Sequence, residues 1–250
     1  MTLHSACTSR ARRAALAGAA ATLLSMMGPT GPAWAATPAI AVITEPVGSD
    51  RLPQLNAQFD AWKKAKLVSS VKLLKAQPGQ KDAGFANLAI VTLPDDKAFK
   101  TWSVDVQGRL GQGAIVRQAD LVKQEGQPSK TPAQAVHVAS LYATHVPATE
   151  YKSYTTSYIT PNMNLQRKSG IMSQYTMYLE RDPVEGVVRS LLVMEYVDEG
   201  AYARREAVKA AGKQQLTSNA GWKRINDTKE SIRTDISSTA ASEIALAGGR

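Results

Sequence analysis

Cysteine is almost absent from this chain, which has one, Cys7, among 250 residues. A single cysteine cannot form an internal disulfide, so the fold has to be held by its hydrophobic core. With 44% hydrophobic residues and 20% charged residues, the composition excludes a disordered, collagen-like or disulfide-rich chain. The length allows one large domain or two small ones.

Long hydrophobic runs are also missing. The longest uncharged stretch rich in apolar residues, 14–27, is shorter than the roughly 20 residues that a membrane helix needs, so we expect no transmembrane segment. Three arginines precede it, and Ala33-Trp34-Ala35 has the small outer residues of a signal cleavage site. The sequence predicts a cleaved signal peptide over 1–35 and a periplasmic or secreted protein. The pair Arg12-Arg13 leaves both the general secretory and the twin-arginine export routes open.

Removal of this segment changes the charge. The net charge falls from +9 to +6, because three of the 30 basic residues and none of the 21 acidic residues lie in it. Cys7 is removed as well, which excludes thiolate catalysis and cysteine-ligated metals. The remaining charge is spread along the chain of an exported protein, so nucleic acid is not an expected partner.

The rest of the chain has the same order of elements twice. In its first part, Leu52, Leu55, Phe59 and Trp62 recur at helical spacing between apolar stretches typical of strands. The predicted elements are a strand at 39–43, a helix at about 50–65, strands at 68–75 and 87–93, a helix from 95 and a strand at 115–123.

A stretch rich in turn-forming residues, 126–132, predicts a linker before the second part. The elements then expected are a strand at 136–143, a helix from 147, strands at 172–179 and 188–196, a helical region from 198 to about 233 and a strand at 234–239. The predicted domains are therefore a first unit at 36–125, a second unit at 133–238 and a disordered tail at 239–250.

Residues are shared between the two parts. Leu93-Pro94-Asp95-Asp96-Lys97-Ala98-Phe99 aligns with Tyr196-Val197-Asp198-Glu199-Gly200-Ala201-Tyr202 at a constant offset. In both segments a strand end is followed by two acids that can cap a helix, then by an alanine and an aromatic residue. This similarity predicts an internal repeat of about 100 residues.

The order β-α-β-β-α-β is that of a ferredoxin-like unit. Together with the shared acidic helix start, it resembles the dimeric α/β-barrel superfamily, which includes antibiotic-biosynthesis-monooxygenase-like and NIPSNAP-like domains. The resemblance implies an α+β fold of two tandem ferredoxin-like units that form a pseudo-dimer with antiparallel sheets. Residues 189–233 also resemble a segment of exported proteobacterial proteins from which no activity transfers.

Tyrosine is unevenly distributed, since all eight tyrosines lie between Tyr142 and Tyr202. Three of them follow the helical spacing i, i+3, i+7 and form one stripe: Tyr151, Tyr154 and Tyr158. We expect this stripe to face the sheet. A core that uses tyrosine explains the pattern, but each buried hydroxyl then needs a hydrogen-bond partner.

The facing strands contribute Tyr175 and Tyr196, and the first strand of this part carries His137. An aromatic cleft with a few polar groups suits a small, flat organic ligand. The candidate ligand-binding residues are therefore Tyr151, Tyr154, Tyr158, Tyr175, Tyr196 and His137.

No pattern indicates a metal or a cofactor. His137 and His145 are the only histidines after the signal segment, and a single straight strand would hold them too far apart to share one ion. The acid pairs at 95–96 and 198–199 are explained by helix capping. Haem-degrading members of the resembled superfamily place a histidine on the second helix of the unit, and neither corresponding helix here contains one.

A basic stripe marks the last helical region, where Arg205, Lys209 and Lys213 recur every four residues. A solvated helix face explains it, and contact with phosphate or anionic lipid is the alternative.

The sequence thus predicts an exported protein that binds a small organic ligand, with aromatic ligands among the candidates, in its tyrosine-rich second part. One alternative is a cofactor-independent monooxygenase or isomerase in which Tyr154, Tyr158 or His137 orients or deprotonates a phenol-like substrate. The other is a non-enzymatic interaction module that uses sheet edges or the basic helix. A homo-oligomer is compatible with each.

Overall fold

The computed structural model describes residues 37–183 and 186–248. The predicted signal peptide, 1–35, lies outside these residues. Over the described ranges, no helix combines the length and the apolar character needed to cross a bilayer.

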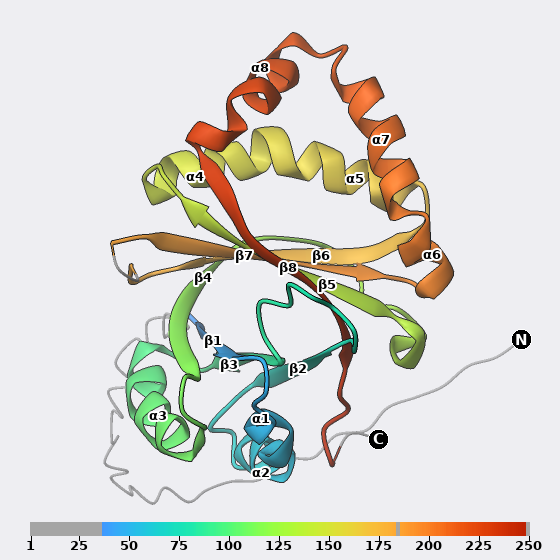
Figure 1. Ribbon diagram of the computed structural model, residues 1–250. Coiled ribbons are helices and arrows are strands. Elements are labelled where there is room, and N and C mark those ends of the chain that lie inside the picture. Colours follow the sequence, from blue (N-terminus) through green and yellow to red (C-terminus); the bar gives the residue numbers. More distant parts are fainter. Residues whose placement is uncertain (1–36, 184–185, 249–250) are drawn as a thin grey trace, which may run out of the picture. The chain divides into compact units, whose positions relative to one another are not determined.

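Eight antiparallel strands form one closed barrel in the order β1-β3-β2-β8-β5-β7-β6-β4, with β4 pairing back to β1. Figure 1 shows the strands between two groups of helices. The strands are β1 (Ala39–Glu45), β2 (Ser70–Ala76), β3 (Asn87–Leu93), β4 (Ile115–Gly126), β5 (Val136–Thr144), β6 (Met172–Glu180), β7 (Val188–Tyr196) and β8 (Arg233–Glu243).

The strand order is the same in each half of the barrel. The first half runs β4-β1-β3-β2, and the second runs β8-β5-β7-β6. Two antiparallel joints, β2 with β8 and β4 with β6, connect the halves. Because the barrel is closed, every described strand is paired on both sides, and no described edge is left to recruit another strand.

Helices cover the outer face of each half, on opposite sides of the barrel (Figure 1). The sequence predicted one helix at about 50–65 where the structure has two, and one long region after 198 where it has three, the last capped by Asn219. The first group is α1 (Arg51–Gln54), α2 (Asn56–Lys64) and α3 (Asp96–Arg109); the second is α4 (Ala148–Tyr154), α5 (Thr160–Lys168), α6 (Glu199–Ala203), α7 (Arg205–Leu216) and α8 (Ala220–Thr228).

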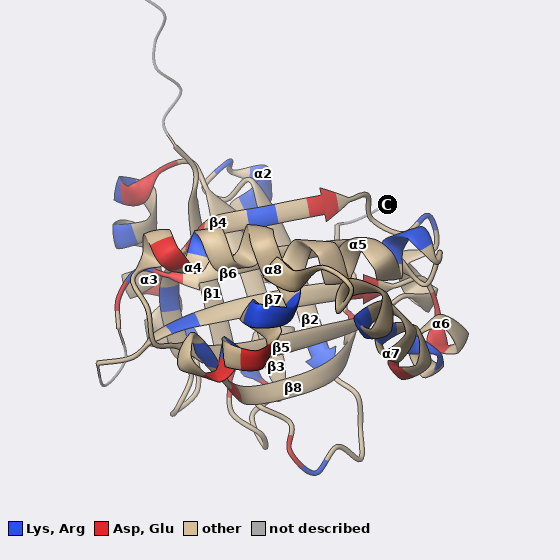
Figure 2. Ribbon diagram, turned by 90° about the horizontal axis from the view of Figure 1, so that it is seen from above, with Lys and Arg blue, Asp and Glu red and all other residues tan. Residues whose placement is uncertain are grey.

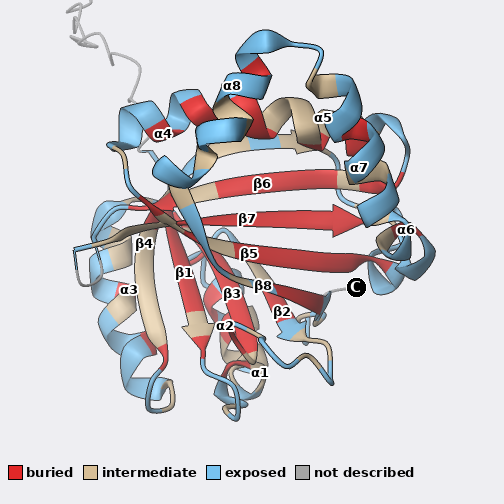
Figure 3. Ribbon diagram, turned by 45° about the horizontal axis from the view of Figure 1, so that its top comes forward, coloured by how far each residue is buried: buried red, intermediate tan, exposed pale blue. Residues whose placement is uncertain are grey.

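Buried side chains form three clusters, and strands β1, β3, β5 and β7 are buried along most of their length (Figure 3). One cluster lies between the first half and its helices and includes Phe59, Trp62 and Trp102. A second lies between the second half and its helices and contains most of the tyrosines. The third fills the barrel interior with Leu74, Leu88 and other aliphatic residues.

The two predicted capping sites have the same geometry. The Asp95 carboxylate accepts a hydrogen bond from the Ala98 amide at 2.7 Å, and Asp198 accepts one from Ala201 at 2.6 Å. Both aspartates have extended backbone, with φ of −162° and −164°. The aligned segments therefore perform the same structural task, a helix start directly after a strand.

The last strand is longer than predicted, which corrects the disordered tail proposed for 239–250. Residues 239–243 belong to β8, where they pair with β2 and β5. Thr239, Ala240 and Ala241 are buried. This part of the strand could not be predicted, because its small residues show no alternation of apolar and polar side chains that would distinguish a strand from a flexible tail.

The linker begins at Gly126, whose φ of +95° is in the left-handed region. A side chain at this position would also collide with the Ser173 carbonyl oxygen. Glycine is therefore required where the chain leaves β4. The linker then passes through a short 3-10 turn, Pro132–Gln134, into β5.

Candidate ligand-binding site

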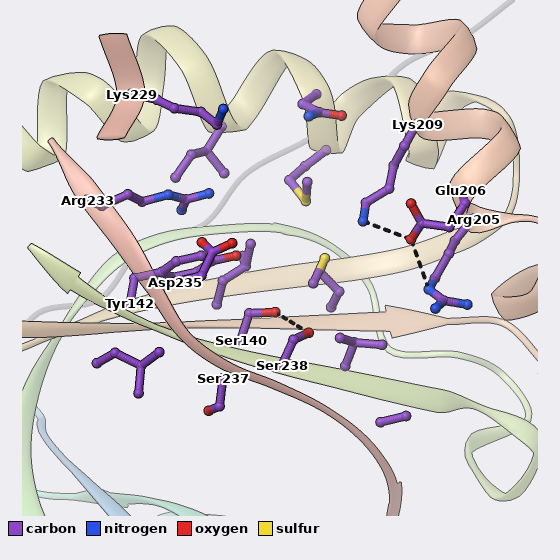
Figure 4. Close-up of a pocket in the computed structure, with 18 of the residues that line it drawn as sticks. Ser140, Tyr142, Arg205, Glu206, Lys209, Lys229, Arg233, Asp235, Ser237 and Ser238 are labelled. Atoms are coloured by element: carbon purple, nitrogen blue, oxygen red, sulfur yellow. Dashed lines mark hydrogen bonds and ion pairs between the residues drawn. The ribbon is translucent and has the colours of Figure 1, made fainter. Parts of the chain in front are cut away.

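A cavity of about 690 Å³ lies between the outer face of the second half-barrel and its helices. Strands β5, β7 and β8 form its floor, and the α4–α5 region, α6 and α7 supply its roof and one end (Figure 4). The Ser140 and Ser238 hydroxyls share a hydrogen bond of 2.9 Å on the floor. This volume is in the range that small organic ligands occupy.

Strand parity decides which residues of β5 reach the cavity. Val138, Ser140 and Tyr142 line it, because alternate residues point to the same face of a strand. His137 is an odd number of residues away from Tyr142 and contacts Lys72 and Glu195 instead. The structure therefore corrects the grouping of His137 with the tyrosine site.

A π-helical turn, Thr155–Ile159, separates α4 from α5 and faces the cavity. Such turns add a residue to a helix and change which side chains point inward. Here Tyr158 and Ile159 line the cavity. The Tyr158 ring stacks on Trp222 at 5.0 Å between centroids, and its hydroxyl donates to Asn226 at 3.0 Å.

The five predicted tyrosines all lie buried in one cluster, but only Tyr158 and Tyr196 line the cavity. Tyr151 shares a 2.6 Å hydrogen bond with Ser190, and Tyr175 donates to Thr160 at 3.2 Å. These two hydroxyls have the partners that a core tyrosine needs. Tyr154 is buried without a hydroxyl partner among the described residues.

Arg233 is the most unusual residue of the site. Its guanidinium carbon lies 3.6 Å from the Tyr142 ring centroid and 5.6 Å from that of Tyr154. The described residues give it no carboxylate within ion-pair distance, and its buried Nη1 has no hydrogen-bond partner. A half-buried cation with one buried, unsatisfied donor atom is costly, so this group is suited to receiving an anion.

The neighbouring tyrosines stay protonated. Burial raises the pKa of Tyr154, Tyr158 and Tyr196, although nearby arginines partly offset this effect for each of them. Neutral phenols beside Arg233 leave its charge uncompensated and can donate or accept hydrogen bonds. None of these hydroxyls is a ready base at neutral pH.

The opposite end of the cavity carries a second cationic group. Glu206 bridges Arg205 at 3.3 Å and Lys209 at 3.1 Å, and all three residues line the cavity (Figure 4). The Arg205 guanidinium carbon lies 3.9 Å from the Tyr202 ring centroid. The sequence treated this basic stripe separately, but the structure brings Arg205 and Lys209 to the tyrosines, whereas Lys213 is exposed and outside the lining.

Charge in the cavity is nearly balanced. Its four cations, Arg205, Lys209, Lys229 and Arg233, face three anions, Glu206, Glu230 and Asp235. Basic and acidic residues are otherwise spread over both halves (Figure 2). Two of the four cations, Lys229 and Arg233, have no carboxylate within ion-pair distance among the described residues. Arg233 differs from Lys229 in its stacking on Tyr142 and in its buried nitrogen without a hydrogen-bond partner.

Sequence reasoning missed three residues that define the site: Tyr142, Tyr202 and Arg233. The sequence could have indicated the two tyrosines, because Tyr142 lies on the same strand as His137 and Tyr202 lies just before Arg205. It could not have indicated Arg233, since its ring partners are distant in the sequence and meet it only through the pairing of β5 with β8.

A metal centre finds no support in the part of the chain that is described. No group of three or more His, Cys, Asp or Glu side chains there is arranged to hold an ion.

No family model matches this sequence, and no curated protein does. Solved structures do resemble the fold. A putative monooxygenase from Fusobacterium nucleatum aligns over 86% of this chain and 97% of its own, with 13% identity and a TM-score of 0.52. An anthrone oxidase-like protein aligns over 83% and 91%, with 8% identity and a TM-score of 0.54. At these identities the likeness establishes the α+β barrel fold alone, and it extends across both halves.

Proposed function

We propose that this protein binds a small, flat aromatic molecule bearing an acidic group in the cavity of its second half. The observation that carries the proposal is Arg233, a half-buried cation stacked on Tyr142 with no carboxylate partner in the described chain. A ligand carboxylate, sulfonate or acidic phenol would supply the missing counterion.

The apolar part of the ligand has partners as well. Met163, Leu192 and Met194 also line the cavity. Methionine adapts to irregular shapes and makes favourable contacts with aromatic rings. An aromatic body over this floor, with its acidic group at Arg233, satisfies both the apolar surface and the unpaired charge.

Turnover has weaker support than binding. Of the side chains that the sequence suggested as a base, His137 and Tyr154 do not line the cavity. Tyr158 lines it, but burial raises the pKa of its hydroxyl. The fold likeness to a putative monooxygenase is compatible with an enzyme but assigns no residue to one.

We extend the proposal to the architecture and the location. The strand order shared by the halves and the matching caps of Asp95 and Asp198 support two tandem ferredoxin-like units, 36–125 and 133–243, that form a pseudo-dimer. The composition of 1–35 supports export to the periplasm or beyond through a cleaved signal peptide. The closed barrel offers no described edge strand for assembly, so a homo-oligomer would use helix faces.

A pair of fluorescent probes tests the ligand class. 8-Anilinonaphthalene-1-sulfonate is flat, aromatic and anionic, and N-phenyl-1-naphthylamine is its uncharged analogue. We expect the sulfonate to bind the mature protein more tightly, and Arg233→Gln to weaken it about tenfold or more, as for loss of a charged hydrogen bond. Arg233→Lys should weaken it less.

Arg109→Gln is the matched control. Arg109 also lies near an aromatic ring, 5.9 Å from the Trp62 centroid, but it is paired with Asp105 and belongs to the first half. Equal binding of the two probes, or equal loss in the Arg109 and Arg233 variants, would show that no specific anion site exists at Arg233.

A further inference from the structure

A second polar cluster lies inside one end of the barrel, on the opposite side of the sheet from the tyrosine cavity. Its members come from four strands of both halves: Lys72 on β2, His137 on β5, Glu195 on β7 and Glu243 on β8. The remainder of the barrel interior is largely aliphatic. Polar side chains in the barrel interior are costly unless they have hydrogen-bond or ion-pair partners, so a cluster of four there suggests a function.

The cluster is organised around Lys72. Its ammonium lies 3.2 Å from a Glu195 oxygen and 3.5 Å from a Glu243 oxygen. The His137 Nε2 lies 3.3 Å and 3.5 Å from the same two oxygens. Glu195 is further held by the Ser129 amide of the linker and by the Gln174 side-chain amide at 2.7 Å.

Two carboxylates share one lysine in this cluster. Lys72 is the one ammonium within ion-pair distance of both Glu195 and Glu243 among the described residues. The Nε2 of His137 also lies 3.2 Å from the Lys72 nitrogen, and its buried Nδ1 has no partner among the described residues. The polar groups of the cluster are therefore not fully satisfied by one another.

A cavity of about 480 Å³ opens onto this cluster. Lys72, Glu195 and Glu243 line it, together with the linker residues Pro128, Ser129 and Pro132. The walls combine hydrogen-bonding side chains, such as Thr176, with the aliphatic surface of Ile90 and Val193. The linker between the halves thus forms part of the rim.

An unpaired acceptor also lines the cavity. Gln174 is 6% exposed, and its amide nitrogen is used by Glu195, but its Oε1 has no partner within the described chain. A buried carbonyl oxygen without a donor is costly and is suited to a ligand that supplies an N–H. The two carboxylates that share Lys72 and the unpartnered Gln174 oxygen both favour a ligand with a cationic hydrogen-bond donor.

We propose that this end of the barrel is a binding site, separate from the tyrosine cavity, for a small molecule bearing a primary ammonium group. The ammonium donates to the Glu243 carboxylate and to the Gln174 oxygen, and the carbon chain lies along Ile90 and Val193. Three donors on one cation match this set of acceptors better than a hydroxyl, which has one.

The test compares two probes of the same shape, n-butylammonium and n-butanol, by calorimetric titration of the mature protein. We expect the ammonium to bind and the alcohol to bind at least tenfold more weakly. Glu243→Gln keeps the shape of the side chain and should weaken the ammonium at least tenfold, and Gln174→Leu should weaken it as well. Glu230→Gln, which removes a carboxylate lining the other cavity, is the control.

Thermal melting identifies any variant that fails to fold. If Gln174→Leu fails to fold, the binding of butylammonium to Glu243→Gln alone tests the proposal. No binding of butylammonium, equal binding of butanol, or equal loss in the Glu230 and Glu243 variants would overturn the proposal. The anionic probe should bind unchanged in Glu243→Gln. The two sites therefore succeed or fail separately.

Discussion

The guanidinium carbon of Arg233 lies 3.6 Å from the centroid of the Tyr142 ring, and its buried Nη1 has no hydrogen-bond partner among the described residues. This stacking stabilises the arginine by about 0.5–2 kcal/mol but does not neutralise it. The position of β8 next to β5 produces the contact, because Arg233 is the first residue of β8. Under the proposed function, this charge favours an anionic ligand over a neutral one.

The mature protein, isolated from its own host, should carry a bound molecule of a few hundred daltons in native mass spectrometry. Arg233 and the apolar floor together support retention of such a ligand. The excess mass should disappear on unfolding and should be reduced in Arg233→Gln. A mass equal to the chain alone in the unmodified protein would count against a tightly held natural ligand.

Loss of the hydroxyl should change the stability of the protein differently at two neighbouring tyrosines of α4. Tyr151→Phe removes the 2.6 Å hydrogen bond to buried Ser190, so it should lower the free energy of unfolding by about 1–2 kcal/mol. Tyr154→Phe removes a buried hydroxyl without a described partner, so it should be neutral or slightly stabilising. Denaturant unfolding measures both, and equal destabilisation would contradict this assignment.

The two helix caps should have the same energetic value. Asp95→Ala and Asp198→Ala each remove one side-chain hydrogen bond to an amide of the first turn, and each should cost about 1 kcal/mol of stability. Asp82→Ala, in an exposed loop, is the control and should cost little. A large difference between the losses of unfolding free energy in the two variants would contradict the prediction that the two caps are equivalent.

The stability of the barrel should fall in acid because of Glu195. Burial alone would raise the pKa of Glu195, but hydrogen bonds from His137 and the Ser129 amide, with the charge of Lys72, lower it well below the ordinary 4.5. A lowered carboxyl pKa contributes stability above the unfolded value, and this contribution is lost as pH falls below about 4.5.

Glu195→Gln should therefore be less stable than the unmodified protein at pH 7, and the difference should narrow toward pH 3. Denaturant unfolding at both pH values provides the measurement. Glu230→Gln, at an exposed position, should keep the pH dependence of the unmodified protein. An unchanged pH dependence in Glu195→Gln would show that Glu195 does not couple to folding.

Element order was predictable because strands such as β3 and β7 are distinct apolar runs. The predicted bounds 87–93 and 188–196 are those of β3 and β7, which are buried on both faces. Antiparallel strands and the α+β class were likewise confirmed. The end of β8 was not predictable, because residues 239–243 are small and weakly patterned and are ordered by their neighbours β2 and β5.

The site was only partly predictable for the same reason. The helical spacing of Tyr151, Tyr154 and Tyr158 placed a tyrosine cluster correctly, and the spacing from His137 to Tyr142 could have excluded that histidine by parity. The cavity itself depends on the π-helical turn and on Arg233, which join segments that no local pattern connects.

The closure of the barrel within one chain has a genetic consequence. In a barrel made from two identical chains, any substitution occurs twice, so a residue that opens a cavity on one side opens it on the other. Here the halves are encoded separately. Phe59, Trp62 and Trp102 fill the core beneath the first helices with edge-to-face contacts at 5.4 and 5.5 Å, while the space beneath the second helices contains a cavity. Substitutions around the cavity of the second half therefore leave the packing of the first half unchanged.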